Sequence, residues 1–164
     1  YLEHSRLSEV QLDEELKALQ LYLELEKDRF EDALDYIIHV SKEVEVRNIK
    51  IPSLFIQPYI ENALKHGLLH KKDNRKLVVN FELDSNKEML ICTIEDNGIG
   101  RTASGKLNAT RAHLHKSFAT TANQKRVELI NKTKKNKTTV SIDDLFDVNE
   151  NASGTRVVIT IPLS

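Results

Sequence analysis

The order of its periodic segments is the feature that most constrains how this chain can fold. Apolar residues at helical spacing run over residues 12–30. Apolar and polar residues then alternate over 34–46, as in a half-buried strand. A second helix is predicted over 52–66, and Gly67 stands where a helix end favours a left-handed residue.

The second half of the chain is richer in strands. Two β-rich runs, 77–83 and 89–95, are joined by a turn-forming segment and predict an antiparallel hairpin. After residue 100 the chain shows little apolar periodicity for about 20 residues, a length that inside compact domains is typical of a functional lid or a disordered loop. We interpret this stretch as a lid. Beyond it the pattern predicts one helix and two closing strands, over 123–135, 138–145 and 155–163.

The resulting order is helix, strand, helix, two strands, loop, helix, two strands. A doubly wound fold would instead alternate strand and helix regularly. The fold class we predict is α+β, a two-layer α/β sandwich in which helices cover one face of a mixed, mostly antiparallel sheet.

Composition limits the function classes. A chain of 164 residues with 40% hydrophobic and 30% charged residues is long enough for one compact domain. The formal net charge of -1 gives no general electrostatic reason to expect nucleic acid as a partner. Cys92 is the only cysteine, so an internal disulfide is impossible and a reducing, cytosolic setting is the simple inference. No apolar run is long enough to cross a membrane, and the beginning at Tyr1 suggests a fragment of a longer protein.

One polar segment lies on the second predicted helix, over residues 61–67. Helical spacing places Asn62, Lys65 and His66 on one face. An asparagine carbonyl oxygen suits Mg²⁺, which prefers hard oxygen donors and shares its shell with phosphates, and the two basic residues could neutralise phosphate charge. A solvated helix face near its C-terminus explains the segment equally well.

Two further segments could line a ligand site. Asp96, Gly98 and Gly100 directly follow a strand: the glycines let backbone approach a flat ligand, and the carboxylate can accept a hydrogen bond from an exocyclic amine such as that of adenine. A plain turn is the alternative. In the segment 154–162, a glycine enters an apolar strand that a proline ends, which alone is typical of an ordinary last strand.

Together, the three segments resemble the nucleotide-binding boxes of the GHKL superfamily of ATP-binding proteins, in order and in separation. Within that superfamily, residues 51–67 closely resemble the LytS/YehU-type sensor histidine kinases, through Gln57-Pro58 followed by Glu61-Asn62-Ala63 and His66-Gly67. Segments 12–16 and 22–30 resemble the helix that leads into the catalytic domain of these kinases.

The resemblance implies a Bergerat-type ATP site with a magnesium ion. It makes Asn62 the magnesium ligand and, with Lys65 and His66, the catalytic group beside the phosphates. Asp96 becomes the residue that reads adenine. The remaining ATP-binding residues that it implies are Gly98, Gly100, Lys116, Ser117 and Thr155.

The same resemblance implies a domain organisation and a set of partners. Residues 1–30 would belong to a linker or dimerisation region, and 31–164 would form the catalytic domain with its lid at about 101–118. The domain would transfer the γ-phosphate of ATP to a histidine on an upstream domain of the same protein, within a homodimer. A response regulator of LytTR type would be the next partner, nucleic acid would not be one, and the domain would be the cytoplasmic part of a membrane-anchored bacterial protein.

This chain departs from its relatives at several positions. Ala119 replaces a glycine near the end of the lid that helps a helix N-terminus bind phosphate. None of the six histidines has the Pro-His-Phe setting of the phosphoacceptor. Pro58 stands where gyrase-type relatives carry the glutamate that activates water, so fast hydrolysis is not expected, and Glu61 is turned about 100° away from Asn62. A pseudokinase that serves as a regulatory or dimerisation module is the alternative function, and a gyrase-like ATPase ranks third.

Overall fold

The computed structural model of the chain describes residues 8–101 and 113–163, and the side chains of residues 113–121 fall outside that description. Within these limits the chain forms strands, two long helices and one helix that continues into a π-helical segment. In chain order the elements are β1 (Glu9–Gln11), α2 (Leu12–Arg29), β2 (Leu34–Val40), β3 (Lys50–Pro52), α3 (Gln57–Asn62), η1 (Ala63–Leu68), β4 (Arg75–Leu83), β5 (Met89–Asp96), α5 (His113–Asn131), β6 (Thr139–Phe146) and β7 (Ala152–Pro162).

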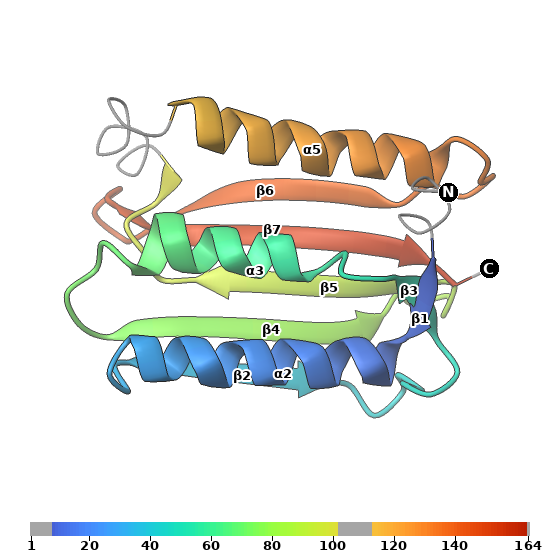
Figure 1. Cartoon of the computed structure of the whole chain (residues 1–164), viewed down its shortest axis with the longest axis horizontal. Helices are drawn as coiled ribbons and strands as arrows, with labels where there is room; N and C mark the ends of the chain where they lie inside the picture. The colour runs from blue at the N-terminus through green and yellow to red at the C-terminus, as the bar shows by residue number, and fades with distance from the viewer. Residues whose placement is uncertain (1–7, 102–112, 164) are drawn as a thin grey trace.

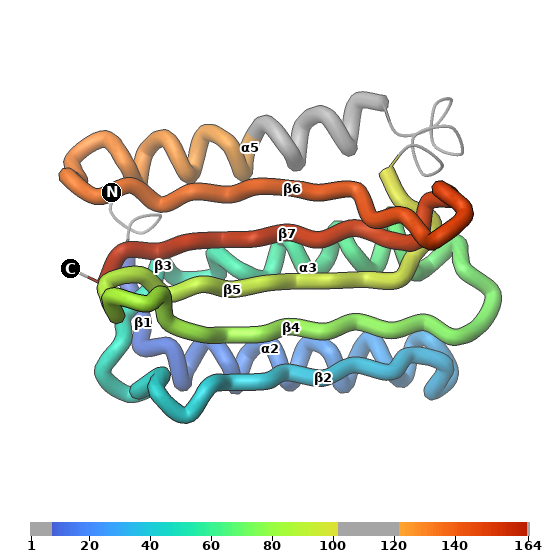
Figure 2. The backbone as a smooth tube through the Cα atoms, turned by 180° about the vertical axis from the view of Figure 1, so that it is seen from behind, coloured from blue at the N-terminus to red at the C-terminus, as the bar shows by residue number. Residues whose placement is uncertain are grey.

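Five of the strands form one sheet in the order β2-β4-β5-β7-β6 (Figure 1). Only β2 and β4 are parallel, and the other three neighbouring pairs are antiparallel. The strands β1 and β3 form a separate two-stranded antiparallel sheet. The helices α2 and α3 cover one face of the sheet, and α5 runs beside β6. Seen from behind, no helix of the described residues covers the opposite face (Figure 2). This arrangement confirms the predicted α+β sandwich.

The alternating pattern of the central strands explains why only one face is covered. Along β5, every second residue from Leu90 to Asp96 is buried, and the residues between them are half-buried. Period-two alternation of this kind places one set of side chains against the helices and leaves the other toward solvent. Cys92 belongs to the buried set.

The helix α2 packs into the same core as the sheet. Its apolar residues Leu12, Leu19 and Leu23 are fully buried, at the spacing of one helix face. The first two backbone N–H groups of α2 donate to carbonyl oxygens of the loop between β2 and β3: Leu12 N–H to Ile49 O at 2.8 Å, and Asp13 N–H to Val46 O at 3.0 Å. The predicted boundary at residue 30, between a linker or dimerisation region and the catalytic domain, stays a prediction. Among the described residues, no helix combines the length and the apolar character of a membrane span.

The helix that carries the polar segment changes its winding halfway. It is α-helical to Asn62 and π-helical from Ala63, where Leu69 N–H donates to Leu64 O, five residues earlier, at 2.8 Å. π segments inside α-helices are rare and frequent at functional sites. The interpretation of Gly67 as a left-handed helix end is wrong, since the glycines with positive φ among the described residues are Gly100 and Gly154. Gly67 is instead needed for space, as described below.

Several element bounds differ from the prediction. The structure adds β1 and β3, three residues each, which are too short to show any periodicity. The strand β2 ends at Val40, and the second helix begins at Gln57. The last helix, α5, begins at His113, ten residues before its predicted start at 123, and ends at Asn131.

Candidate functional site

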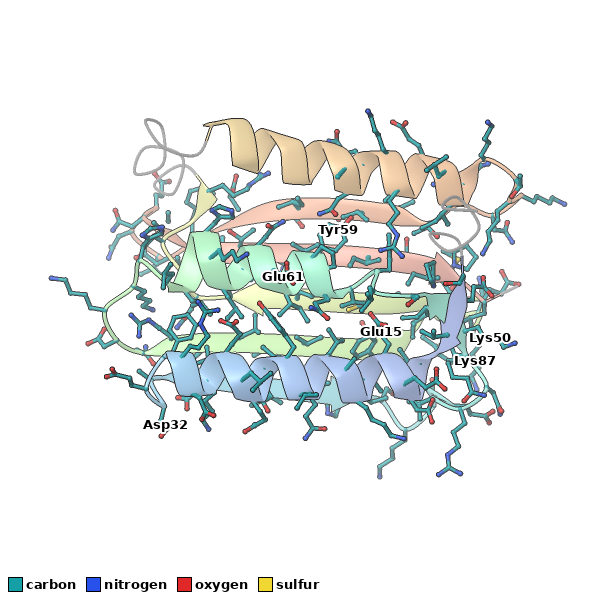
Figure 3. The ribbon with its side chains drawn as sticks, in the orientation of Figure 1. Glu15, Asp32, Lys50, Tyr59, Glu61 and Lys87 are labelled. Atoms are coloured by element: carbon teal, nitrogen blue, oxygen red, sulfur yellow. The ribbon has the colours of Figure 1, made fainter. Side chains whose placement is uncertain are left out.

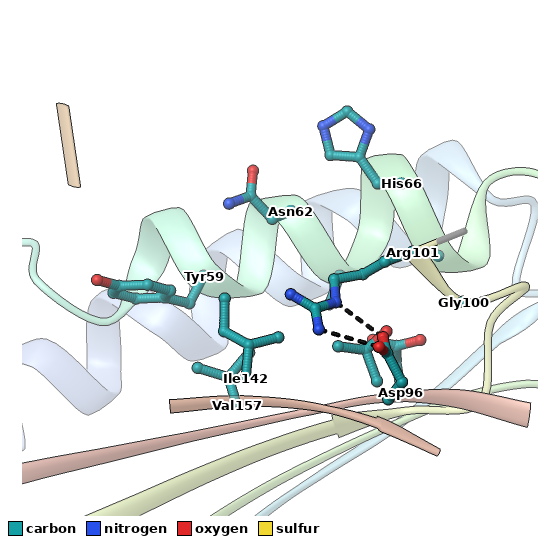
Figure 4. Close-up of a pocket in the computed structure, with 12 residues that line it drawn as sticks. Tyr59, Asn62, His66, Asp96, Gly100, Arg101, Ile142 and Val157 are labelled. Atoms are coloured by element: carbon teal, nitrogen blue, oxygen red, sulfur yellow. Dashed lines mark hydrogen bonds and ion pairs between the residues drawn. The ribbon is translucent and has the colours of Figure 1, made fainter. Parts of the chain in front are cut away.

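A pocket of about 490 Å³ lies between the α3–η1 helix and the sheet (Figure 4). Its volume falls within the range of about 300–1,000 Å³ that is usual for small-molecule sites. The helix supplies one wall, the loop after β5 supplies another, and three strands supply the floor. The lining residues are Tyr59, Asn62, Ala63, His66, Gly67, Asp96, Gly100, Arg101, Ile142, Asp144, Thr155 and Val157.

The floor consists of two neighbouring rows that cross β5, β7 and β6. In the first row, Asp96 pairs with Thr155, which pairs with Asp144. In the next row toward the middle of the sheet, Val157 pairs with Ile142. A polar row therefore adjoins an apolar one, which suits a flat, mostly apolar ring that carries hydrogen-bonding groups at its edge.

Asp96 is the buried charged group of this floor. It is only 4% exposed, and its Oδ1 accepts the N–H of Gly98 at 2.9 Å. Burial raises the pKa of Asp96 from 3.8 to about 6, although hydrogen bonds from the backbone N–H groups of Gly98 and Thr155 and the charge of Lys71 act in the opposite direction. At pH 7 the carboxylate is thus ionised and ready to accept a further hydrogen bond.

Two glycines allow the Asp96 loop to lie directly against the π segment. A Cβ on Gly67 would lie 2.7 Å from Asp96 Oδ1, and a Cβ on Gly98 would lie 2.3 Å from the carbonyl carbon of Gly67. Ile99 N–H donates to Gly67 O at 3.2 Å and fixes this contact. Gly98 therefore acts by close packing against the helix and does not itself line the pocket.

Asn97 anchors the same loop to the start of β4. Its Oδ1 accepts the N–H of Lys76 at 2.8 Å, and its Nδ2 donates to Asn74 O at 2.7 Å. Lys71 Nζ donates to the carbonyl oxygen of Asn97 at 2.9 Å. The backbone that presents Asp96 is thus held from three directions.

We expect Lys71→Met to make ligand binding at this pocket more sensitive to acid. Removal of the ammonium group removes an interaction that favours ionised Asp96, so the pKa of that carboxyl should rise further. If the ligand requires the ionised form, affinity near pH 6.5 should fall about threefold, and the midpoint of the pH profile should move to higher pH. Titration calorimetry with an adenine nucleotide between pH 5.5 and 8 measures this. Lys72→Met, at an exposed neighbour, serves as the control, and identical profiles for both variants would contradict the assignment.

An ion pair lies at the edge of the pocket. Arg101 Nε and Nη2 donate to the two carboxylate oxygens of Asp144 at 2.8 and 3.0 Å, as the dashed lines in Figure 4 mark. Each charge stabilises the other, which raises the pKa of Arg101 and lowers that of Asp144. The side chains are 48% and 36% exposed, so water screens the pair and its contribution to stability is small.

The helix wall presents Asn62 and His66 from the same side, one turn apart (Figure 4). Lys65 is exposed and does not line the pocket. Glu61 does not line it either, and its Oε1 accepts the side-chain N–H of Gln57 at 3.1 Å. The change to π winding after Asn62 is the local reason why Lys65 leaves the face on which α-helical spacing placed it, while Asn62 and His66 stay on one side.

Of the residues predicted from the sequence, the structure brings Asn62, His66, Asp96, Gly100 and Thr155 together around one pocket. Lys116 and Ser117 lie in the first turns of α5, where side chains are not described. The predicted lid over 101–118 is described only at Arg101 and, as backbone, from residue 113 onward.

Sequence reasoning missed the apolar part of the floor and the ion pair. Val157 could have been found, since it lies two residues after Thr155 on the same strand and therefore on the same face. Ile142 and Asp144 depend on the register between β6 and β7, which the sequence alone does not fix. Tyr59, at the start of α3, belongs both to the buried core and to the pocket lining, and no sequence signal distinguishes it from its apolar neighbours.

Comparison with known proteins places this geometry in context. No protein-family model matches the chain. The sensor protein kinase HptS of Staphylococcus aureus is 34% identical over 95 residues, which is 58% of this chain and 17% of HptS. The chain thus spans about a sixth of the length of the curated relatives it matches.

Solved structures of histidine kinases share the fold. The catalytic domain of histidine kinase ThkA superposes with a TM-score of 0.61 at 11% identity, over 95% of each chain. The histidine kinase AdeS of Acinetobacter baumannii gives 0.60 at 20% identity, over 97% of this chain and 69% of that one. A mycobacterial sensor histidine kinase, MprB, gives 0.60 at 14% identity, over 94% and 96%.

The chain therefore has the fold of histidine kinase catalytic domains, and its sequence is similar to that of a bacterial sensor kinase. Both findings support the predicted function, an ATP-binding histidine kinase catalytic domain. The predicted LytS/YehU subfamily is a finer assignment, and similarity to HptS does not show it.

Proposed function

We propose that this chain is the ATP-binding catalytic domain of a LytS-type sensor histidine kinase. Its pocket holds Mg·ATP and presents the γ-phosphate to a histidine on another part of the protein. The observation that carries the proposal is the buried carboxylate of Asp96, which faces a pocket of nucleotide size whose helix wall carries Asn62 and His66.

Adenine is the base that fits this floor. The Asp96 carboxylate has only acceptor capacity when ionised, so it pairs with the exocyclic amine of adenine. Guanine would present a carbonyl oxygen at the same ring position, and acceptor would face acceptor. Val157 and Ile142 offer an apolar surface for the ring beside this bond, and Thr155 supports the edge of the base from β7.

The residues on the helix wall fit a magnesium ion that is shared with phosphates. Magnesium usually keeps several waters and takes one or two oxygen ligands from the protein when it binds with a nucleotide. Asn62 supplies one such oxygen. Among the described residues, no group of three or more His, Cys, Asp or Glu side chains is arranged to hold a metal by itself, which agrees with binding that depends on the nucleotide. When bound, the ion neutralises phosphate charge.

The reaction asks the domain chiefly for positioning. An imidazole nitrogen of the acceptor histidine attacks the γ-phosphorus, the bond from that phosphorus to the β,γ-bridging oxygen breaks, and ADP leaves with that electron pair. His66 lines the pocket near Asn62 and is proposed to offset phosphate charge, whereas Lys65, which is exposed and outside the pocket lining, is not. Pro58 occupies the helix position one turn before Asn62 and carries no carboxylate, so no base at that position activates water.

The partners follow from this proposal. The acceptor histidine belongs to an upstream domain of the same protein, within a homodimer. A response regulator, of LytTR type in this subfamily, then takes the phosphate from the histidine. The domain works in the bacterial cytoplasm and is anchored to the membrane through other parts of the protein.

We expect Asn62→Ala to remove the magnesium-dependent part of ATP binding. The affinity for a non-hydrolysable ATP analogue with Mg²⁺ should fall about 30-fold or more, because one metal ligand and its hydrogen bonds are lost. Affinity for AMP without Mg²⁺ should change less than about twofold. Isothermal titration calorimetry measures both.

The control for this experiment is Asn80→Ala, which removes an asparagine from β4 at a position outside the pocket lining. It should leave both affinities unchanged. If the unaltered chain bound no ATP analogue, or if Asn62→Ala bound it as tightly as the unaltered chain, the proposed function would be contradicted.

A further inference from the structure

A short turn precedes the helix that carries the proposed magnesium ligand. This 53–56 turn, formed by Ser53, Leu54, Phe55 and Ile56, connects β3 to α3. Leu54 has a φ of 53°, in the left-handed region that leucine rarely adopts. Phe55 and Ile56 are buried, at 2% and 0% exposure. A strained conformation persists only where its surroundings fix it, so the contacts of this turn matter.

The helix α5 contacts the backbone carbonyl groups of the turn through one side chain, Arg126. The guanidinium of Arg126 donates to Leu54 O at 2.8 Å through Nη1 and to Ser53 O through Nη2. The same group lies over the Phe55 ring, 5.6 Å from its centroid. One side chain thus makes two hydrogen bonds and a cation–π contact with the turn, a combination that the planar, forked guanidinium allows and an ammonium does not.

The helix α2 contacts the backbone N–H groups of the turn through one side chain, Glu15. Glu15, which is 3% exposed, accepts the N–H of Leu54 at 3.2 Å, and Ile56 N–H also donates to this carboxylate. Figure 3 shows Glu15 between α2 and α3. Burial raises the pKa of Glu15, and the charge of Arg126 opposes that effect. The two opposite charges therefore hold the same turn from its two sides.

This arrangement links the two helices of the nucleotide site. The helix α3 begins at Gln57, directly after the turn, and reaches the pocket with Asn62. The helix α5 begins at His113, thirteen residues before Arg126, which corresponds to about 20 Å of helix. The first turns of α5 contain Lys116 and Ser117, two of the predicted ATP-binding residues. Over that length, a small change in the angle at which α5 meets the turn becomes a larger displacement of the N-terminal turns of α5.

We propose that Arg126 is a positioning residue for nucleotide binding. By fixing α5 to the 53–56 turn, it sets the place of the α5 N-terminal turns relative to the helix that carries Asn62. This inference rests on the proposed function, and it concerns the phosphates of the nucleotide more than its base. Asp96, which faces the base, lies on β5 and does not depend on this contact.

The test compares a nucleotide that has phosphates with one that has none. Arg126→Met keeps an unbranched side chain and removes both hydrogen bonds and the cation–π contact with Phe55. We expect the affinity for a non-hydrolysable ATP analogue with Mg²⁺ to fall about tenfold, while the affinity for adenosine changes less than about twofold. Lys125→Met, at the exposed neighbouring position on α5, should change neither affinity.

Arg126→Lys gives a second, milder variant in case the first does not fold. An ammonium keeps the charge but cannot bridge both carbonyl groups in the plane of a guanidinium, so we expect an intermediate loss of ATP affinity. Equal losses for ATP and adenosine would show general loosening of the fold and overturn the proposal. Unchanged ATP affinity in Arg126→Met would overturn it as well.

A measurement without nucleotide separates this inference from the proposed function. Backbone amides of Gln57–Asn62 should exchange with deuterium at least about fivefold faster in Arg126→Met than in the unaltered chain, with Lys125→Met unchanged. If the unaltered chain did not bind ATP, the proposed function would fail, and the exchange rates would still decide whether Arg126 fixes α3. Unchanged exchange would contradict the inference.

Discussion

Asp96→Asn is expected to make the protein more stable at pH 7.5 and to abolish tight binding of ATP. The buried carboxyl has a pKa of about 6, against 3.8 as its ordinary value. This separation corresponds to about 3 kcal/mol that ionisation of the buried group costs above pH 6. An amide carries no charge and avoids the cost. We expect the free energy of unfolding to rise by about 1–3 kcal/mol at pH 7.5, with the loss of one acceptor oxygen reducing the gain.

The direction of the pH dependence follows from the raised pKa. Native Asp96 holds its proton more tightly than the unfolded chain does, so its contribution to stability is complete below about pH 3.8 and is lost as pH rises through about 6. The variant cannot lose that contribution. Its advantage over the unaltered chain should therefore be largest above pH 7 and disappear near pH 4, in urea unfolding at several pH values.

The same substitution should lower affinity for ATP by at least about 100-fold. The single oxygen of the new amide can accept the N–H of Gly98 or that of Thr155, but not both. Its NH₂ group is itself a donor, so it would face either the other backbone N–H or the exocyclic amine of adenine, and neither can accept a hydrogen bond. Asp143→Asn, at an exposed position on β6, changes a carboxylate to an amide outside the pocket and should alter neither property. Weaker stability in Asp96→Asn at pH 7.5, or undiminished ATP affinity, would contradict the role of Asp96.

Gly154→Ala is expected to have the largest effect on folding. Gly154 has a φ of 145°, and a Cβ at this position would lie 1.9 Å from Asp96 O and 2.9 Å from the Asp96 carbonyl carbon. Only a glycine accommodates both the conformation and the contact. Because the clash is with backbone of the neighbouring strand, it cannot be relieved by rotation of a side chain.

We expect this variant to lose at least about 3 kcal/mol of stability, which lowers Tm by about 6–12 °C in a chain of this size. The displaced strand would also move Asp96, so ATP affinity should fall with stability. Ser153→Ala changes the adjacent residue of β7 and should shift Tm by less than about 2 °C. Thermal unfolding followed by circular dichroism distinguishes them, and similar Tm values for the two variants would contradict the close packing.

Much of the fold was predictable because its central elements are long and strongly periodic. Alternation in β4 and β5 and the helical spacing of Leu12, Leu19 and Leu23 in α2 each reflect burial of one face against a single core. The three-residue strands β1 and β3 were missed, since a segment of that length has no measurable period. The start of α5 was missed although Leu114, Phe118 and Ala122 recur at four-residue intervals, because the whole segment was interpreted as part of a lid.

The site residues were predictable where the sequence motif lies on a regular backbone element that fixes the direction of its side chain. Asn62, Asp96 and Thr155 each lie where a helix, a strand end or a paired strand fixes one side chain toward the pocket. Lys65 was placed by α-helical spacing, which does not hold across the π-helical segment that begins at Ala63. The contacts of Arg126 with the 53–56 turn join residues more than 70 positions apart in the chain, and no local pattern indicates them.

Transfer of labelled phosphate tests the central claim most directly. The chain is incubated with γ-labelled ATP, Mg²⁺ and the upstream domain that is proposed to carry the acceptor histidine. We predict that label appears on that histidine as an acid-labile, base-stable phosphate, and that Asp96→Asn, though stable, transfers none. Tight binding of ATP with no label on the histidine would contradict a kinase and favour the regulatory pseudokinase that Ala119 also suggests.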